Sequence, residues 1–199
     1  MMNQRMPESE ILNKFAEVVS SALRVDTERV TPDVYLDELG AESLDLIEIT
    51  METEQQFNIF LPDKSILDTA IEVFGPGVLE KDGYLTEEGK RLIAARMPSD
   101  DAGQFEGEIA VKDFKRYFLK VSTWVRMIDG LLEFAPQRCE ACGGKMVASM
   151  GFRSKCSSCG QEITLRSGEE INREWVERYH QTEYLGRSVP QGLRAAAAH

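Results

Sequence analysis

The sequence predicts a mainly α-helical chain with one small β-structured module in its C-terminal third. Several segments place apolar residues three and four positions apart, which is the repeat of an amphipathic helix. All four cysteines, in contrast, lie in one short stretch, between residues 139 and 159. The chain has 199 residues and 42% apolar content, enough to build a core.

The first expected helix covers residues 8–24, and the second runs from about Ser43 to Gln56. One face of the first helix collects these apolar residues: Ile11, Leu12, Phe15, Val18, Val19 and Leu23. A loop should separate the two helices, because Pro32 and Gly40 interrupt a stretch in which apolar residues are sparse.

The second helix has two apolar stripes when it is projected at 100° per residue. The stripe expected to face the core consists of Leu46, Ile49, Thr50, Thr53 and Phe57. The opposite stripe consists of Leu44, Ile47 and Met51, flanked by Asp45, Glu48 and Glu52. Two readings remain open for the opposite stripe. It is either buried under residues 75–110 or exposed as a docking surface with an acidic rim.

The remaining helices are expected further along the chain. Residues 64–74 should form a short helix, stopped by the Gly-Pro-Gly at 75–77. Residues 75–110 are interpreted as an insertion, with one possible helix after Thr86. Apolar residues then keep a helical period over 111–132, which predicts one helix of more than twenty residues. A last amphipathic helix is expected over residues 169–184.

Charge and composition limit the function. The formal net charge of −11 argues against a general nucleic-acid binder, which depends on Lys and Arg to neutralise phosphates. Residues 31–63 hold nine acidic residues and no basic one, a distribution that favours basic protein partners. No stretch reaches the ~20 apolar residues of a membrane span and no signal sequence opens the chain, so we expect a cytoplasmic location.

Ser43 stands where the second helix begins. A serine at this place is most often the helix cap. The partial positive charge at a helix N-terminus also favours a phosphodiester on the serine hydroxyl. The sequence alone leaves both roles open.

Residues 38–62, "ELGAESLDLIEITMETEQQFNIFLP", resemble the acyl carrier proteins. The matching positions are Leu39-Gly40-Ala41, Ser43-Leu44-Asp45, Glu48, Met51, Glu54, Phe57, Ile59 and Pro62. The resemblance is close over residues 8–62, continues weakly over 109–132, and departs at Glu42, where the family usually has Asp. It implies a four-helix bundle with about thirty-five inserted residues before its fourth helix.

The resemblance also implies a function. Ser43 would bear 4′-phosphopantetheine, added by a phosphopantetheinyl transferase, and would carry acyl groups as thioesters in lipid or polyketide biosynthesis. Enzymes with basic docking surfaces would then contact Glu42, Leu44, Asp45, Ile47, Glu48 and Met51. The protein itself would be a carrier and not an enzyme.

The cysteines form two Cys-x-x-Cys pairs, Cys139 with Cys142 and Cys156 with Cys159, separated by thirteen residues. This spacing is typical of a Cys₄ zinc site with a structural role, because four thiolates leave no position for a catalytic water. With short strands between and after the pairs, the module resembles a zinc ribbon. The alternative is two disulfides or a redox pair, which reducing conditions in the cytoplasm disfavour.

These expectations combine into an acyl-carrier-type bundle over residues 1–134 with an insertion at about 75–110. A zinc-ribbon module with a C-terminal helix follows over 135–185, and a flexible tail over 186–199. The alternative function is a zinc-ribbon module that binds proteins or nucleic acid, attached to a carrier-like bundle that is never loaded.

Overall fold

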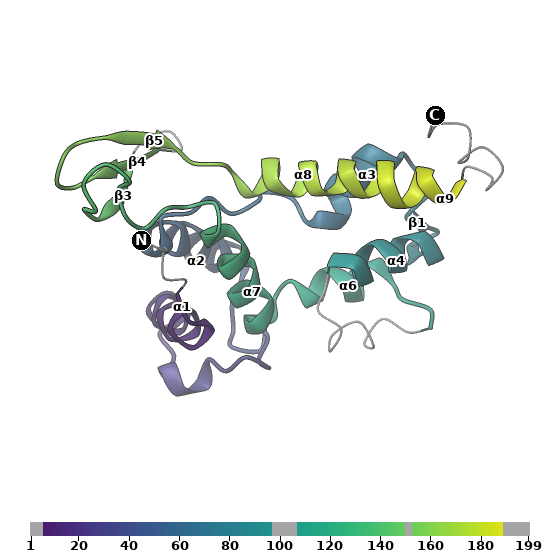
Figure 1. Ribbon diagram of the computed structural model, residues 1–199. Coiled ribbons are helices and arrows are strands. Elements are labelled where there is room, and N and C mark those ends of the chain that lie inside the picture. The colour runs from purple at the N-terminus through teal and green to yellow at the C-terminus, as the bar shows by residue number, and fades with distance from the viewer. Residues whose placement is uncertain (1–5, 97–106, 150–152, 189–199) are drawn as a thin grey trace, which may run out of the picture. The chain divides into compact units, whose positions relative to one another are not determined.

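The computed structural model describes residues 6–96, 107–149 and 153–188 and is drawn in Figure 1. The expected class is confirmed, because helices dominate and a small antiparallel sheet lies within the cysteine region. The chain divides into two compact units. The first unit consists of residues 1–63 and 115–168, and the second of residues 64–114 and 169–199. The boundaries expected along the chain, with a break after residue 134, stay a prediction.

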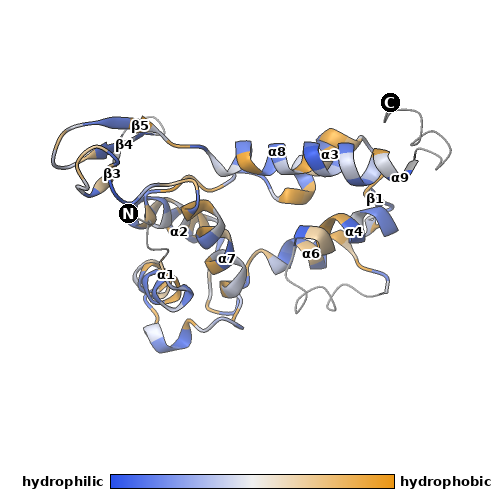
Figure 2. Cartoon of the chain, viewed as in Figure 1, coloured by the Kyte–Doolittle hydropathy of each residue, from blue (hydrophilic) through white to orange (hydrophobic). Residues whose placement is uncertain are grey.

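Three helices form the bundle of the first unit. Helix α1 (Glu8–Leu23) packs against both α2 (Ser43–Phe57) and α7 (Val121–Leu132), and a 3-10 turn η1 (Thr27–Arg29) follows α1. Figure 2 shows that α1 carries apolar residues on one side and polar residues on another. The buried core includes Ile11, Phe15, Val19, Leu36, Ile49, Phe57, Val121, Trp124, Val125 and Ile128. The rings of Phe15 and Trp124 stack with their centroids 5.3 Å apart.

The long helix expected over residues 111–132 is wrong, because the structure has two helices there. Helix α6 (Val111–Tyr117) ends before α7 begins. Between them the backbone pairs with the loop before α2. The Leu36 N–H donates to the Leu119 carbonyl at 2.8 Å, and the Val121 N–H donates to the Val34 carbonyl at 3.0 Å. These bonds to a distant segment replace helical ones, so an apolar period could not reveal the break.

The cysteine region forms a three-stranded antiparallel sheet in the order β3-β4-β5. Its strands are β3 (Met146–Ser149), β4 (Arg153–Cys156) and β5 (Glu162–Thr164). A buried hydrogen bond of 2.7 Å runs from Asn58 Nδ2 to Ser154 Oγ, and it joins the residue that ends α2 to strand β4. The sheet is therefore attached to the C-terminal end of α2 and belongs to the same unit as the bundle.

In its described residues the second unit contains helices and a hairpin. Helix α3 (Ile66–Phe74) precedes a hairpin of β1 (Glu80–Lys81) and β2 (Tyr84–Leu85), which leads into α4 (Glu87–Arg96). Later in the chain α8 (Gly168–Tyr179) continues into a π-helix η3 (His180–Leu185) and a last turn α9 (Gly186–Ser188). The buried residues of this unit include Leu67, Ala70, Leu79, Leu92, Ile93, Phe114 and Val176.

Two expected segments fall partly outside the described residues. The insertion at 75–110 contains the hairpin and α4, while its residues 97–106 lie outside. The tail expected to be flexible over 186–199 is helical at Gly186–Ser188, and its residues 189–199 lie outside. Where the structure describes the chain, none of its helices combines the length and apolar character needed to cross a membrane.

Glycine is required at position 89, where α4 passes close to the hairpin. A Cβ placed on Gly89 would lie 2.2 Å from the carbonyl oxygen of Leu79. We therefore expect Gly89→Ala to lower the free energy of unfolding by about 1–3 kcal/mol through overpacking. Chemical denaturation followed by circular dichroism measures this change.

Gly130 in α7 offers the matched control, because a Cβ placed there meets nothing within 4 Å. Gly130→Ala should leave stability unchanged or raise it by up to ~1 kcal/mol, since Ala favours a helix over Gly. Equal effects of the two substitutions would contradict the close approach at Gly89.

Candidate functional site

Glu42, and not Ser43, caps helix α2. The Glu42 N–H donates to Asp45 Oδ2 at 2.7 Å, while the Glu42 carboxylate accepts from the Asp45 N–H. This reciprocal pair is a capping box. Ser43 is the first helical residue and is exposed, and among the described residues its hydroxyl makes no hydrogen bond. The capping role considered for Ser43 is thus filled by its neighbour, and the Ser43 hydroxyl is available.

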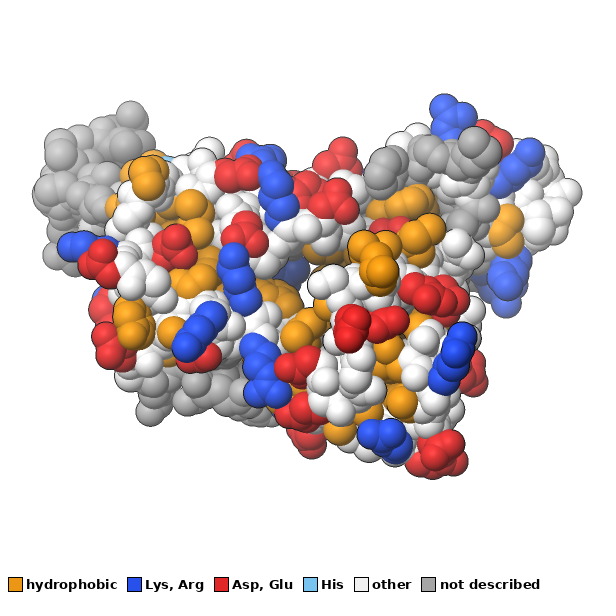
Figure 3. All heavy atoms as spheres, turned by 180° about the vertical axis from the view of Figure 1, so that it is seen from behind, with side chains coloured by type: hydrophobic (Ala, Val, Ile, Leu, Met, Phe, Trp, Pro, Cys, Tyr) orange, Lys and Arg blue, Asp and Glu red, His pale blue; other side chains and the backbone are white. Residues whose placement is uncertain are grey.

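The two stripes of α2 differ in exposure. The outer stripe is exposed, with Leu44 at 79%, Ile47 at 56% and Met51 at 55% of the maximum. Ile49, Thr53 and Phe57 on the inner stripe are buried, and Leu46 and Thr50 are half-buried. Figure 3 shows apolar side chains beside groups of Asp and Glu on the surface of the molecule. An exposed apolar stripe next to carboxylates begins at Ser43.

The C-terminal end of α2 is held by a partly buried carboxylate. Glu54 Oε1 accepts the Leu61 N–H at 2.9 Å, across the turn that follows the helix. Burial raises the pKa of Glu54, although the hydrogen bond from Leu61 acts in the opposite direction. Asn58 ends the helix in the left-handed conformation, with φ 53°, and contacts Ser154. One end of α2 thus presents Ser43 and the other end holds the sheet.

The four cysteines converge on one point. Their Sγ atoms all lie within 4.8 Å of one another, with Cys139 and Cys159 at 3.7 Å and Cys142 and Cys156 at 3.4 Å. Zinc–sulfur bonds of about 2.3 Å in a tetrahedron place sulfur atoms about 3.8 Å apart. All four cysteines are free, and the sulfur distances exceed a disulfide bond of about 2.0 Å. The donor set therefore fits one tetrahedral metal ion.

The two cysteine pairs are closed by the same backbone hydrogen bond. Gly143 N–H donates to the Cys139 carbonyl at 2.8 Å, and Gly160 N–H donates to the Cys156 carbonyl at 3.0 Å. Both glycines have positive φ, 71° and 75°, a region that other residues rarely adopt. The glycine after each Cys-x-x-Cys closes the turn that brings two sulfurs together, so the sequence repeat is also a geometric one.

Backbone donors favour a thiolate at Cys156. The N–H groups of Cys159 and Ser158 point to Cys156 Sγ at 3.5 and 3.4 Å and lower the pKa of that thiol to about 6. The pKa of Cys142 moves the other way, to about 12. The Gly144 N–H lowers the pKa of Cys142, but the neighbouring sulfurs of Cys156 and Cys159 raise it by more. The two N–H groups thus favour the thiolate form of Cys156, which is the form in which a cysteine binds a metal ion.

Comparison with known proteins gives one consistent result for the N-terminal part. A model of the phosphopantetheine attachment site matches residues 13–70. The acyl carrier protein of Guillardia theta is 44% identical over 59 residues, which make up 29% of this chain and 73% of that protein. The acyl carrier protein of Thermosynechococcus vestitus is 40% identical over 60 residues, or 30% of this chain and 74% of that protein. The chain belongs to the acyl carrier protein family.

The carrier is longer than these relatives. The family match ends at residue 70, so most of the second unit and the whole cysteine cluster lie beyond it. No solved structure matches the chain significantly.

The structure brings together most of the residues singled out by the sequence. Glu42, Ser43, Leu44, Asp45, Ile47, Glu48 and Met51 lie on the first turns of α2, and the four cysteines form one cluster. Sequence reasoning missed Arg116 and Lys120, which form ion pairs with the loop before α2. They lie about eighty residues from their partners, and no local pattern could have indicated this contact.

The capping box gives a test of how the start of α2 is held. Glu42→Ala removes the carboxylate that accepts the Asp45 N–H, and should lower the free energy of unfolding by about 1 kcal/mol. Glu48→Ala, on the exposed face of the same helix, should change it by less than about 0.5 kcal/mol. Urea denaturation of both variants measures the difference, and equal values would show that Glu42 is not the cap.

Proposed function

We propose that this carrier bears 4′-phosphopantetheine on Ser43 and holds acyl groups as thioesters on the terminal thiol of that arm. In the loading step, Ser43 Oγ bonds to the phosphorus of the phosphopantetheine in coenzyme A. The adenosine bisphosphate leaves with the electrons of the broken P–O bond, and a base of the transferase takes the serine proton. The protein is a carrier in this proposal, and its partners perform the chemistry.

The observation that carries the proposal is the free hydroxyl of Ser43 at the N-terminus of α2. Because Glu42 caps the helix, Ser43 can be modified without loss of a structural hydrogen bond. The first N–H groups of a helix and its dipole favour a phosphodiester at this place. The family match over residues 13–70 includes Ser43.

We propose the outer stripe of α2 as the docking surface for these partners. Its apolar centre is formed by Leu44, Ile47 and Met51, and its acidic residues are Glu42, Asp45 and Glu48. An apolar centre with a charged rim is the usual anatomy of an interface between proteins. Carboxylates would steer transferases and acyl-processing enzymes with basic surfaces towards Ser43.

Loading is tested by incubating the full chain with coenzyme A and a broad-specificity phosphopantetheinyl transferase. Intact mass should increase by one phosphopantetheine group, and Ser43→Ala should abolish the increase. Ser21→Ala, an exposed serine on α1, is the matched control and should load normally. A mass increase that persists in Ser43→Ala would refute the assignment of the site.

We also propose that the cysteine cluster, formed by Cys139, Cys142, Cys156 and Cys159, holds one structural Zn²⁺. The fit of four sulfurs to a tetrahedron supports this, and four thiolates would fill the coordination of the ion. The Asn58–Ser154 hydrogen bond ties strand β4, which ends at Cys156, to the end of α2. A metal ion at the cluster would therefore also stabilise the bundle.

Metal analysis of freshly purified, reduced protein should give about one zinc per chain. Cys156→Ser should lower zinc content strongly, whereas Ser158→Ala, which keeps the backbone N–H to Cys156, should not. Acidification should release the metal because protons compete for the thiolates.

Removal of zinc also tests the link between the cluster and the bundle. Chelation should lower the melting temperature of the bundle as well as of the sheet. Unchanged bundle stability after zinc removal would contradict the coupling.

A further inference from the structure

The loop that leads to Ser43 is bound by cations from the same chain. We define the acidic loop by its carboxylates Asp33, Asp37 and Glu38, all of which are exposed. Arg116 Nε contacts Asp37 Oδ2 at 3.0 Å, and Arg116 Nη2 contacts Glu38 Oε1 at 2.8 Å. Lys120 Nζ contacts Asp33 Oδ1 at 3.1 Å. Three carboxylates are thereby matched by two cations.

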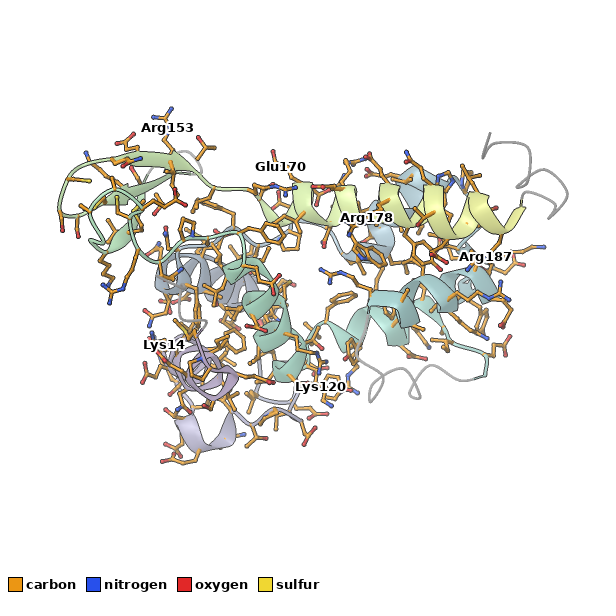
Figure 4. All side chains as sticks on the ribbon, in the orientation of Figure 1. Lys14, Lys120, Arg153, Glu170, Arg178 and Arg187 are labelled. Atoms are coloured by element: carbon orange, nitrogen blue, oxygen red, sulfur yellow. The ribbon has the colours of Figure 1, made fainter. Side chains whose placement is uncertain are left out.

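Arg116 is held in this position by more than its ion pairs. Its guanidinium lies over the ring of Tyr35, 4.5 Å from the centroid, and its two carboxylate contacts raise its pKa, Asp37 more than Glu38. The Leu119 N–H also donates to the Arg116 carbonyl at 2.8 Å, in the turn whose backbone pairs with the loop. Figure 4 labels Lys120 at the start of α7, next to that turn. Arg116 is therefore directed at the loop by the fold.

The acidic residues on α2 differ from those of the acidic loop in their ion pairing. Within the described residues Glu48 and Glu52 have no ion pair, and Glu42 and Asp45 serve the capping box. The charge available to a basic partner thus lies on α2, while the acidic loop is largely neutralised. Opposite charges on two surfaces raise the rate of association, and a cation already bound to a carboxylate removes that effect.

We propose that Arg116 is a specificity-determining residue for the loading of Ser43, which rests on the function proposed above. Its guanidinium occupies the place on the acidic loop that a cationic side chain of a partner would take. It therefore lowers the steering of a transferase whose basic surface reaches the acidic loop when it docks on α2. Two of the chain's own acids are in this way withheld from basic partners.

The test measures kcat/KM for transfer of phosphopantetheine from coenzyme A to the full chain, across a range of salt concentrations. Arg116→Gln should raise kcat/KM roughly threefold or more at low salt, with kcat itself unchanged, because it frees Asp37 and Glu38. The gain should vanish near 1 M salt, where the screening length is only about 3 Å. A merely structural role would lower kcat at every salt concentration.

Two controls separate the local effect from the net charge. Lys14→Gln removes one positive charge from α1, where Lys14 pairs with Glu10, and should leave kcat/KM close to wild type. The triple variant with Arg116→Gln, Asp37→Asn and Glu38→Gln should lose the gain. If Arg116→Gln equals wild type or Lys14→Gln, the inference is overturned while the proposed function stands. If the wild-type chain is not loaded at all, both are overturned.

Discussion

The carrier bundle depends on the backbone pairing between the loop before α2 and the segment before α7. About eighty residues separate these two segments in sequence. The backbone hydrogen bonds of Leu36 with Leu119 and of Val34 with Val121 hold the later segment against the bundle. Only then can α7 supply Trp124 to stack on Phe15. The entropic cost of closing a loop rises only slowly with the length of the loop, so such an insertion is compatible with a stable bundle.

Helix α2 links the two functional features of the first unit. Its fifteen residues span about 21 Å at ~1.5 Å per residue, from Ser43 at one end to Phe57 at the other. The capping box holds the first turn, and Asn58 joins the last turn to the cysteine sheet. Because Asn58 and Ser154 are both buried, loss of order in the sheet would leave a buried amide without this partner. The sheet is thus structurally part of the carrier and not a separate appendage.

The sequence predicted what depends on local patterns. Apolar spacing placed α1 and α2 within a residue or two, and the Cys-x-x-Cys-Gly repeat corresponds to two turns with matching hydrogen bonds. It failed where distant segments decide the outcome. The break at residues 118–120 follows from backbone pairing with the loop before α2. Residue preference alone makes Ser43 a candidate cap, yet Glu42 caps the helix because Asp45 completes a reciprocal pair.

The net charge of the chain is a poor guide to the local charge around Ser43. The chain carries −11, and residues 31–63 contain acids only, so the sequence suggests a uniformly negative surface around Ser43. Arg116 and Lys120 divide that surface into a largely neutralised loop and a helix on which Glu48 and Glu52 have no ion pair among the described residues. Screening limits exposed charges to a range of about 8–10 Å in physiological salt, so a partner responds to these local groups more than to the total. Both cations lie just after the insertion in sequence. The segment that returns the chain to the bundle therefore also supplies the two cations that alter the charge near Ser43.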